Sequence, residues 1–442
     1  MDRTQIDTVI EARWIIPAEP NGLILENHAI AIDKGVIQAV QPILEINLQF
    51  SPIERIILPQ HALIPGLINL HTSGAMALMR GIAGNLPLGS CHNNYISSAE
   101  TRHLSSDFVL DGTRLACIEM LRGGITCFND MYFFPEESAK AVLASGMRGV
   151  IGMVASDFPT AYASDVDDYI AKGLAVRDEY RHHSLLSFCF SPPSPNTLSD
   201  KALTKILTYA EQLDLPIHTY LHETEAGIKY SLKNFDMRPL SRLHKLGLLS
   251  PSFIGVKMNY LTEKEIQLTG AQGCNVVYCP SSSLRSIDKL SSISIFLKHG
   301  VNVGLGTGNA AYNNRLDMFE AMRLVALLAK GKDSVTNLSA HQILQMATIN
   351  SAKALGLEDR IGSLVKGKMA DITAIDFSAP ELLPCYDPVS HVVCSSGREN
   401  VSHLWVGGKM LLKEKKLTSF DEDDILARVH FWENRIKINK DG

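Results

Sequence analysis

The feature that most constrains the fold is a series of eight short apolar segments, each followed by polar residues and then by a helical stretch. They run from Ile64 to Leu70, Ile125 to Asn129, Gly149 to Val154, Leu185 to Phe190, Pro216 to Leu221, Phe253 to Met258, Asn275 to Tyr278 and Val301 to Leu305. Strands that alternate with helices predict parallel βα units. Because eight such units close a barrel, we expect an α/β chain built around a (β/α)8 TIM barrel.

The two ends of the chain predict a second, smaller domain. Both ends are rich in short β segments, and Gly407-Gly408 near the C-terminal end predicts a hairpin turn. The most economical arrangement packs both ends together as one small β-sandwich. We therefore expect residues 1–63 and 368–442 to form this composite domain and residues 64–367 to form the barrel.

A last helix is expected from about Asp421. Apolar residues at helical spacing predict that it buries one face. These residues are Ile425, Leu426, Val429, Trp432 and Ile436.

Charge and hydropathy exclude several classes of partner. The formal net charge is −5, and no basic block is interleaved with aromatic residues. This pattern does not favour binding to nucleic acid or to an anionic membrane. The first seven residues carry Asp2 and Asp7, where a signal peptide would be basic, and no apolar stretch approaches the roughly 20 residues of a spanning helix. We expect a cytoplasmic protein.

In a parallel barrel, catalytic side chains lie where strands end and the following loops begin. The residues at these positions are His71, Ser73, Pro193, Tyr220, Glu223, Lys257, Ser281 and Gly308. His71-Thr72-Ser73 is one change short of a His-x-His motif, in which two imidazoles on one face of a strand bind a metal ion. Whether the residues at the other strand ends can also bind a metal therefore decides between a metal-dependent and a metal-free site.

The motifs flanking these positions resemble the amidohydrolase superfamily, and within it the S-adenosylhomocysteine/5'-methylthioadenosine deaminases and the related chlorohydrolases. They include Pro65-Gly66-Leu67-Ile68-Asn69, Met79-Arg80-Gly81, Phe128-Asn129-Asp130-Met131-Tyr132, His222-Glu223-Thr224, Asn313-Asn314-Arg315-Leu316-Asp317-Met318 and Ala347-Thr348-Ile349-Asn350. The resemblance covers nearly the whole chain. It implies a fold of barrel plus sandwich and a homodimeric assembly.

The resemblance also implies one divalent metal, zinc or iron, held by two His after strand one, a His after strand five and an Asp after strand eight. Such an ion makes hydroxide available near neutral pH. Of this set only His71 is retained, because Ser73, Tyr220 and Gly308 stand at the other three positions. His218 lies deeper in its strand and is not expected to be a ligand. Since zinc requires about three protein ligands, we expect no metal cofactor; the alternative is one divalent metal, as in the family.

Two catalytic candidates follow from the same comparison of positions. Glu223 matches the family residue that protonates the purine ring, and Lys257 replaces the His of strand six, which stabilises the attacking oxygen. We expect Lys257 and Glu223 to form an ion pair, because pairing offsets the cost of burying either charge alone. A buried Lys can also act as a base or nucleophile.

Three further residues are candidates for binding substrate. Glu100 aligns with the family residue that binds ribose hydroxyls and Arg148 with a substrate arginine, while the phenol of Tyr220 is expected to occupy space that the metal and the Asp share in the family. The alternative for Glu100 and Arg148 is an ordinary structural ion pair.

Two functions remain open at this point. In the leading interpretation the chain is a catalytically degenerate, metal-free member of the family that binds a purine nucleoside or has a regulatory role. In the alternative it is an active hydrolase or deaminase that acts on C–N bonds of a purine-like substrate through a rebuilt site of Lys257, Glu223 and Tyr220. A purely structural role fits less well.

Overall fold

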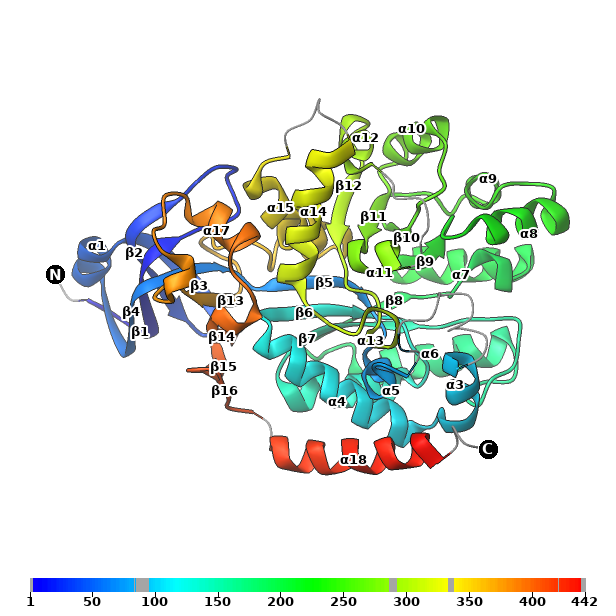
Figure 1. Cartoon of the computed structure of the whole chain (residues 1–442), viewed down its shortest axis with the longest axis horizontal. Coiled ribbons are helices and arrows are strands. Elements are labelled where there is room, and N and C mark those ends of the chain that lie inside the picture. The colour runs from blue at the N-terminus through cyan, green and yellow to red at the C-terminus, as the bar shows by residue number, and fades with distance from the viewer. Residues whose placement is uncertain are drawn as a thin grey trace. The chain divides into compact units, whose positions relative to one another are not determined.

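A computed structural model of the chain describes residues 3–82, 84, 95–285, 292–332, 338–419 and 421–438. The strands form two sheets (Figure 1). One is the barrel expected from the eight alternating segments, and the other joins strands from the two ends of the chain. The fold class predicted from the sequence is confirmed.

The barrel sheet has the order β12-β11-β10-β9-β8-β7-β6-β5. Its strands are β5 (Leu67–Thr72), β6 (Ile125–Asp130), β7 (Arg148–Met153), β8 (Leu186–Phe190), β9 (Ile217–Leu221), β10 (Phe253–Lys257), β11 (Asn275–Tyr278) and β12 (Asn302–Leu305). The pairs from β7 to β12 are parallel. The amide of Gly308, just after β12, donates to the carbonyl of His71 in β5 at 3.0 Å, so the two edges of the sheet meet.

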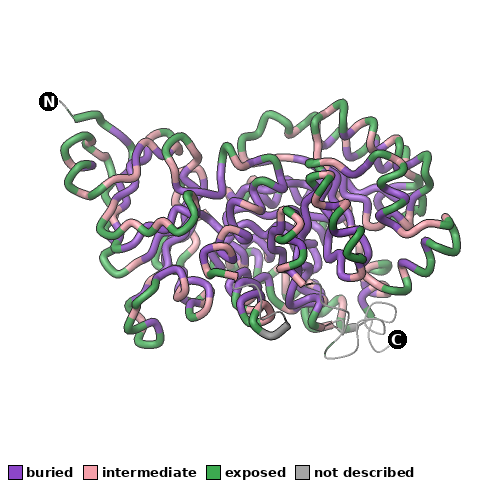
Figure 2. Tube along the Cα trace, turned by 90° about the horizontal axis from the view of Figure 1, so that it is seen from above, coloured by how far each residue is buried: buried purple, intermediate pink, exposed green. Residues whose placement is uncertain are grey.

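Helices follow the barrel strands, as βα units require. They are η1 (Gly74–Met79), α3 (Ser97–His103), α4 (Ser106–Arg122), α5 (Pro135–Ser145), α6 (Val166–Tyr180), η3 (Pro195–Thr197), α7 (Asp200–Leu213), α8 (Glu225–Phe235), α9 (Pro239–Lys245), α10 (Glu263–Ala271), α11 (Pro280–Arg285), α12 (Ile293–Lys298), α13 (Ala310–Asn313), α14 (Met318–Lys332), α15 (Ala340–Met346) and α16 (Ile349–Ala354). Most residues of the barrel strands are buried, whereas the helices have exposed segments; Figure 2 shows the buried and exposed parts of the chain trace.

The second sheet has the order β16-β15-β14-β13-β4-β1-β2-β3. Its strands are β1 (Thr4–Ile15), β2 (Leu25–Asp33), β3 (Val36–Pro42), β4 (Phe50–Pro65), β13 (Ile372–Asp376), β14 (Val401–Val406), β15 (Lys409–Lys413) and β16 (Lys416–Leu417). The antiparallel pairing of β4 with β13 joins the two ends of the chain. Gly407 and Gly408 turn the chain between β14 and β15 with φ of 54° and 75°, as the hairpin prediction required. Short helices complete this region: α1 (Ile43–Gln49), η4 (Pro380–Leu382), α17 (Pro388–Cys394) and η5 (Arg398–Asn400).

The chain divides into two compact units. The first comprises Met1–Asn69, Glu119–Cys127 and Asp317–Ser419, and the second Leu70–Ile118, Phe128–Leu316 and Phe420–Gly442. Every residue of the candidate site described below lies in the second unit. The domain boundaries predicted from the sequence stay a prediction.

The last helix, α18 (Glu422–Ile438), belongs to the second unit. Trp432 is buried against Phe108 of α4, and both Trp432 Nε1 and Arg428 Nε donate to Asp111 Oδ2 at 2.8 Å. Ile425 is buried as predicted, but Leu426 is 45% exposed. Leu426 is one residue out of phase with the buried stripe, a rotation of about 100° around the helix.

Among the described residues, no helix is both long and apolar enough to cross a membrane.

Candidate active site

The centre of the site is a contact between β5 and β9. His218 and Tyr220 are two residues apart on β9, so both side chains project from the same face of the strand. Both meet His71 of β5: the Tyr220 hydroxyl lies 2.7 Å from His71 Nε2, and His218 Nε2 lies 3.2 Å from His71 Nδ1. On its far side, His218 Nδ1 lies 3.4 Å from Ser191 Oγ, in the loop after β8. Four side chains therefore form one hydrogen-bonded chain.

Burial sets the protonation of this chain. Desolvation, with smaller contributions from the nearby His218 and Lys257, lowers the pKa of His71 well below its usual 6.5. Desolvation lowers the pKa of His218 to about 3. Burial, followed by the charge of Glu223, raises the pKa of Tyr220 well above 10. At neutral pH each imidazole is uncharged and carries one N–H, and the phenol keeps its proton.

The charged part of the site is the ion pair expected between Lys257 and Glu223. Lys257 Nζ donates to Glu223 Oε1 at 2.6 Å, with the Lys side chain buried and the Glu side chain 30% exposed. Lys257 ends β10 with φ of +68°, a left-handed conformation that costs energy for a residue other than glycine. Such strain is typical of functional sites. The ammonium also lies 5.6 Å from the centre of the Tyr220 ring.

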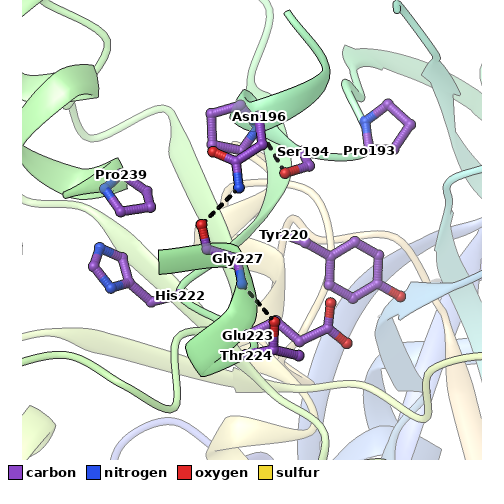
Figure 3. A pocket seen from close by; sticks show the side chains of 10 residues that line it. Pro193, Ser194, Asn196, Tyr220, His222, Glu223, Thr224, Gly227 and Pro239 are labelled. Carbon is purple, nitrogen blue, oxygen red and sulfur yellow. Dashed lines mark hydrogen bonds between the residues drawn. The ribbon is translucent and has the colours of Figure 1, made fainter. Parts of the chain in front are cut away.

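A pocket opens beside these residues and holds about 390 Å³ of space, part of it open to solvent (Figure 3). The lining residues are Pro193, Ser194, Pro195, Asn196, Tyr220, His222, Glu223, Thr224, Gly227 and Pro239. Tyr220 lies near the end of β9 and the others follow β8 or β9, so the pocket lies at the carboxyl ends of the strands, where barrels carry their catalytic groups.

The positions that would hold the remaining metal ligands have other partners. Ser73 Oγ donates to the carbonyl of Met131 at 2.9 Å. Gly308 has φ of +67°, and its carbonyl accepts from the hydroxyl of Thr72 at 2.9 Å. Ser281, a strand-end residue outside this ligand set, is buried at the start of α11.

The two residues expected to bind a nucleoside lie apart in the structure. Glu100 of α3 accepts a hydrogen bond from the Tyr132 hydroxyl at 2.7 Å, which orients its carboxylate. Arg148 is buried as the first residue of β7 and donates to the carbonyl of Ser184 at 2.9 Å. It stands at the amino end of its strand, whereas the pocket lies at the carboxyl ends. The described contacts do not bring Arg148 together with Glu223.

Sequence reasoning did not assign roles to His218 and Ser191. The signal for His218 was its spacing of two residues from Tyr220, which predicts a shared face on a strand. No signal pointed to Ser191, because its contact with His218 depends on how two neighbouring strands are placed. The same holds for the pairing of Tyr220 with His71.

Comparisons with known proteins identify the family. The model of the amidohydrolase family matches residues 62–411, and the chain belongs to this family. It is 41% identical over 440 residues, 99% of both chains, to a 5-methylthioadenosine/S-adenosylhomocysteine deaminase of Saccharophagus degradans. It is 40% identical to the protein of the same name from Teredinibacter turnerae, with 98% of each chain covered.

A solved structure gives the same result. The chain superimposes on an adenosine deaminase from Xanthomonas campestris with bound zinc, with a TM-score of 0.97, 39% identity and coverage of 99% of this chain and 100% of that one. Atrazine chlorohydrolase from Arthrobacter aurescens, at 22% identity and a TM-score of 0.90, shares the fold.

These comparisons correct two interpretations made from the sequence. The degenerate, non-catalytic role is wrong, because relatives up to 41% identical over the whole chain are named as deaminases. The expectation of a metal-free protein is overturned by the zinc in the Xanthomonas structure. The number of retained metal ligands bears on only one requirement for catalysis, and it did not determine whether the protein is an enzyme.

The residues around His71 nevertheless do not fit a zinc ion held in the family's way. Within the described ranges, no group of three or more His, Cys, Asp or Glu is placed to hold a metal ion. The His71 nitrogen that faces Tyr220 is already hydrogen-bonded. A catalytic zinc requires about three protein ligands, and the described side chains do not supply them.

Proposed function

We propose that this protein is an aminohydrolase that removes an amino group from a purine-like nucleoside, with Glu223, Lys257 and Tyr220 at the reacting ring. The observation that carries the proposal is the 2.6 Å ion pair of Lys257 and Glu223 beside the pocket. Relatives named as deaminases of methylthioadenosine and S-adenosylhomocysteine, and of adenosine, support adenosine derivatives as the substrate class.

In hydrolytic deamination, the oxygen of water bonds to the ring carbon, the carbon–nitrogen bond breaks and ammonia leaves. One proton of the water ends on the ring nitrogen and the other on the departing ammonia. Glu223 is the proposed carrier of these protons, since its carboxylate lines the pocket and is partly open to solvent. The ammonium of Lys257 holds this carboxylate and stabilises negative charge that develops on the attacking oxygen.

Two other predicted features belong to this proposal. Glu100, oriented by Tyr132, is the proposed partner of the ribose hydroxyls. Arg148 is not included, because it lies at the opposite end of its strand. The homodimer and the cytoplasmic location stay predictions, and size-exclusion chromatography tests the first.

The test is ammonia release by the purified protein from adenosine, methylthioadenosine and S-adenosylhomocysteine, with and without added zinc. Glu223→Gln and Lys257→Met should each lower the rate by about 100-fold or more. Lys229→Met is the matched control, because Lys229 forms an exposed pair with Glu225, and it should leave the rate unchanged. Absence of ammonia from every substrate under both conditions would overturn the proposed function.

A further inference from the structure

We propose that Tyr220 selects ligands by presenting only hydrogen-bond acceptors to the pocket, and that His71, His218 and Ser191 are the positioning residues that fix this polarity. The inference rests on the proposed function for the class of ligand. It concerns which groups on the base the site accepts, and it stands on the chain of contacts from Ser191 through the two imidazoles to Tyr220.

The three hydrogen bonds of this chain must all run in the same donor-to-acceptor direction, which is the polarity of the chain. Each uncharged imidazole has one N–H and one acceptor nitrogen. If His71 Nε2 accepts from Tyr220, its Nδ1–H must donate to His218 Nε2, and the Nδ1–H of His218 must then donate to Ser191 Oγ. If any one bond is reversed, all three reverse together.

Two observations favour one direction. At one end, a phenol is a stronger acid than an imidazole N–H, and an imidazole nitrogen is a better base than a phenol oxygen, so the 2.7 Å contact favours donation by Tyr220 to His71. At the other end, the Cys189 thiol donates to Asn129 Oδ1 at 3.4 Å. Its sulfur is then left to accept from the Ser191 hydroxyl at 3.2 Å, and the Ser191 oxygen is free to accept from His218.

The consequence concerns the pocket. The only hydrogen of the Tyr220 hydroxyl is used by His71, so the oxygen offers lone pairs alone to a ligand. Figure 3 shows the phenol oxygen beside the carboxylate of Glu223, which is also an acceptor. Lys257 is the donor on the other side of Glu223, so the restriction applies to a ligand group that lies against the Tyr220 oxygen. An exocyclic amino group satisfies that oxygen, whereas a carbonyl at the same place leaves two acceptors facing each other. The Tyr220 oxygen therefore favours a 6-amino purine over a 6-oxo purine whose carbonyl lies against it.

The first measurement reads the polarity without any ligand. Nitrogen NMR of protein labelled with 15N-histidine, assigned with His71→Gln and His218→Gln, should show Nδ1 protonated and Nε2 unprotonated in both residues. A His71 with its proton on Nε2 overturns the inference.

The second measurement tests whether the site prefers an amino ligand to a carbonyl ligand. Calorimetry compares 1-deazaadenosine, which keeps the amino group but lacks the ring nitrogen that must be protonated, with inosine, which carries the carbonyl. Wild type should bind 1-deazaadenosine about tenfold or more tightly, as expected when a mismatch leaves polar groups unpaired. Tyr220→Phe should bring this ratio towards one; an equal ratio in wild type and Tyr220→Phe overturns the inference.

His218 provides the test of positioning. His218→Leu should lower the preference for the amino ligand, and His218→Gln, which retains an acceptor for His71, should restore part of it. If His218 only fills space, both variants should show the same ratio of affinities for 1-deazaadenosine and inosine. If neither ligand binds wild type, the nucleoside function and the selection fall together, while the NMR result still decides the polarity of the chain.

Discussion

Lys257 and Glu223 form a 2.6 Å ion pair between the end of β10 and the loop after β9, and only the carboxylate side of the pair is open to solvent. A Lys buried at this depth is stable when its charge has a partner. The pair therefore links the stability of the barrel to its proposed chemistry.

Lys257→Met should lower the free energy of unfolding by about 1–3 kcal/mol. This is below the full cost of breaking a buried pair, because Glu223 retains access to water. Adding Glu223→Gln should recover part of the loss, so the double variant should be more stable than the sum of the single effects. Urea denaturation measures all three. The exposed pair of Lys229 and Glu225 is the control, and Lys229→Met should change stability by less than about 0.5 kcal/mol; strictly additive effects at Lys257 and Glu223 would argue against the coupling.

The stability of the protein should fall as the pH is lowered from 7 to 5, partly through His218. Its pKa is about 3 in the folded state and about 6.5 when unfolded. Below pH 6.5 the unfolded chain therefore binds a proton that the folded chain does not, and stability is lost as the pH falls towards 3. At pH 5 this residue accounts for a loss of about 2 kcal/mol.

The measurement is the midpoint of urea unfolding against pH. His218→Gln should reduce the loss of unfolding free energy between pH 7 and 5 by about 2 kcal/mol. This holds whatever the substitution does to the stability at pH 7. His182→Gln, at an exposed position, is the control and should follow wild type. The same slope in wild type and His218→Gln would show that His218 is not the source.

The barrel could be predicted closely from the sequence because its signal is repeated eight times. The differences lie at the ends of strands. Ile64 was assigned to the first barrel strand but belongs to β4, where it pairs with Thr373 of β13. An apolar run does not reveal where one sheet ends and another begins, because both bury the same residue types.

The site could be predicted only in part, for a related reason. The residues at strand ends were identifiable, and so was the pair of opposite charges. The contact of His71 with Tyr220 joins residues 149 positions apart, and it depends on two strands that are not neighbours in the sheet order. Spacing along one strand placed His218 and Tyr220 on a common face but did not identify what they face.

Trp432→Ala should destabilise the protein by about 3–5 kcal/mol. Its ring is buried against Phe108, and its indole N–H is bonded to the buried Asp111, so the truncation leaves a cavity and removes one of the two donors to this carboxylate. Phe431→Ala removes the adjacent aromatic ring, which is 45% exposed, and should cost less than about 1 kcal/mol. Thermal and urea unfolding measure both variants; equal losses would mean that α18 does not dock through Trp432.

Replacing Tyr220 by His and Gly308 by Asp together should raise the affinity for zinc at least tenfold over wild type. The hydroxyl of Tyr220 lies 2.7 Å from His71 Nε2, so an imidazole at position 220 approaches the same nitrogen. A Cβ at Gly308 would lie 3.5 Å from Ser282 Cβ, an ordinary contact, and Asp tolerates the left-handed backbone there better than most residues. With His71, the variant offers the nitrogen and oxygen ligands that zinc prefers. Competition with a chromophoric chelator measures the affinity, and Tyr220→Phe, which removes the phenol without adding a ligand, is the control. If the double variant and Tyr220→Phe bound zinc equally, positions 220 and 308 would not converge on one ion, and the site would have diverged in its backbone as well as in its side chains.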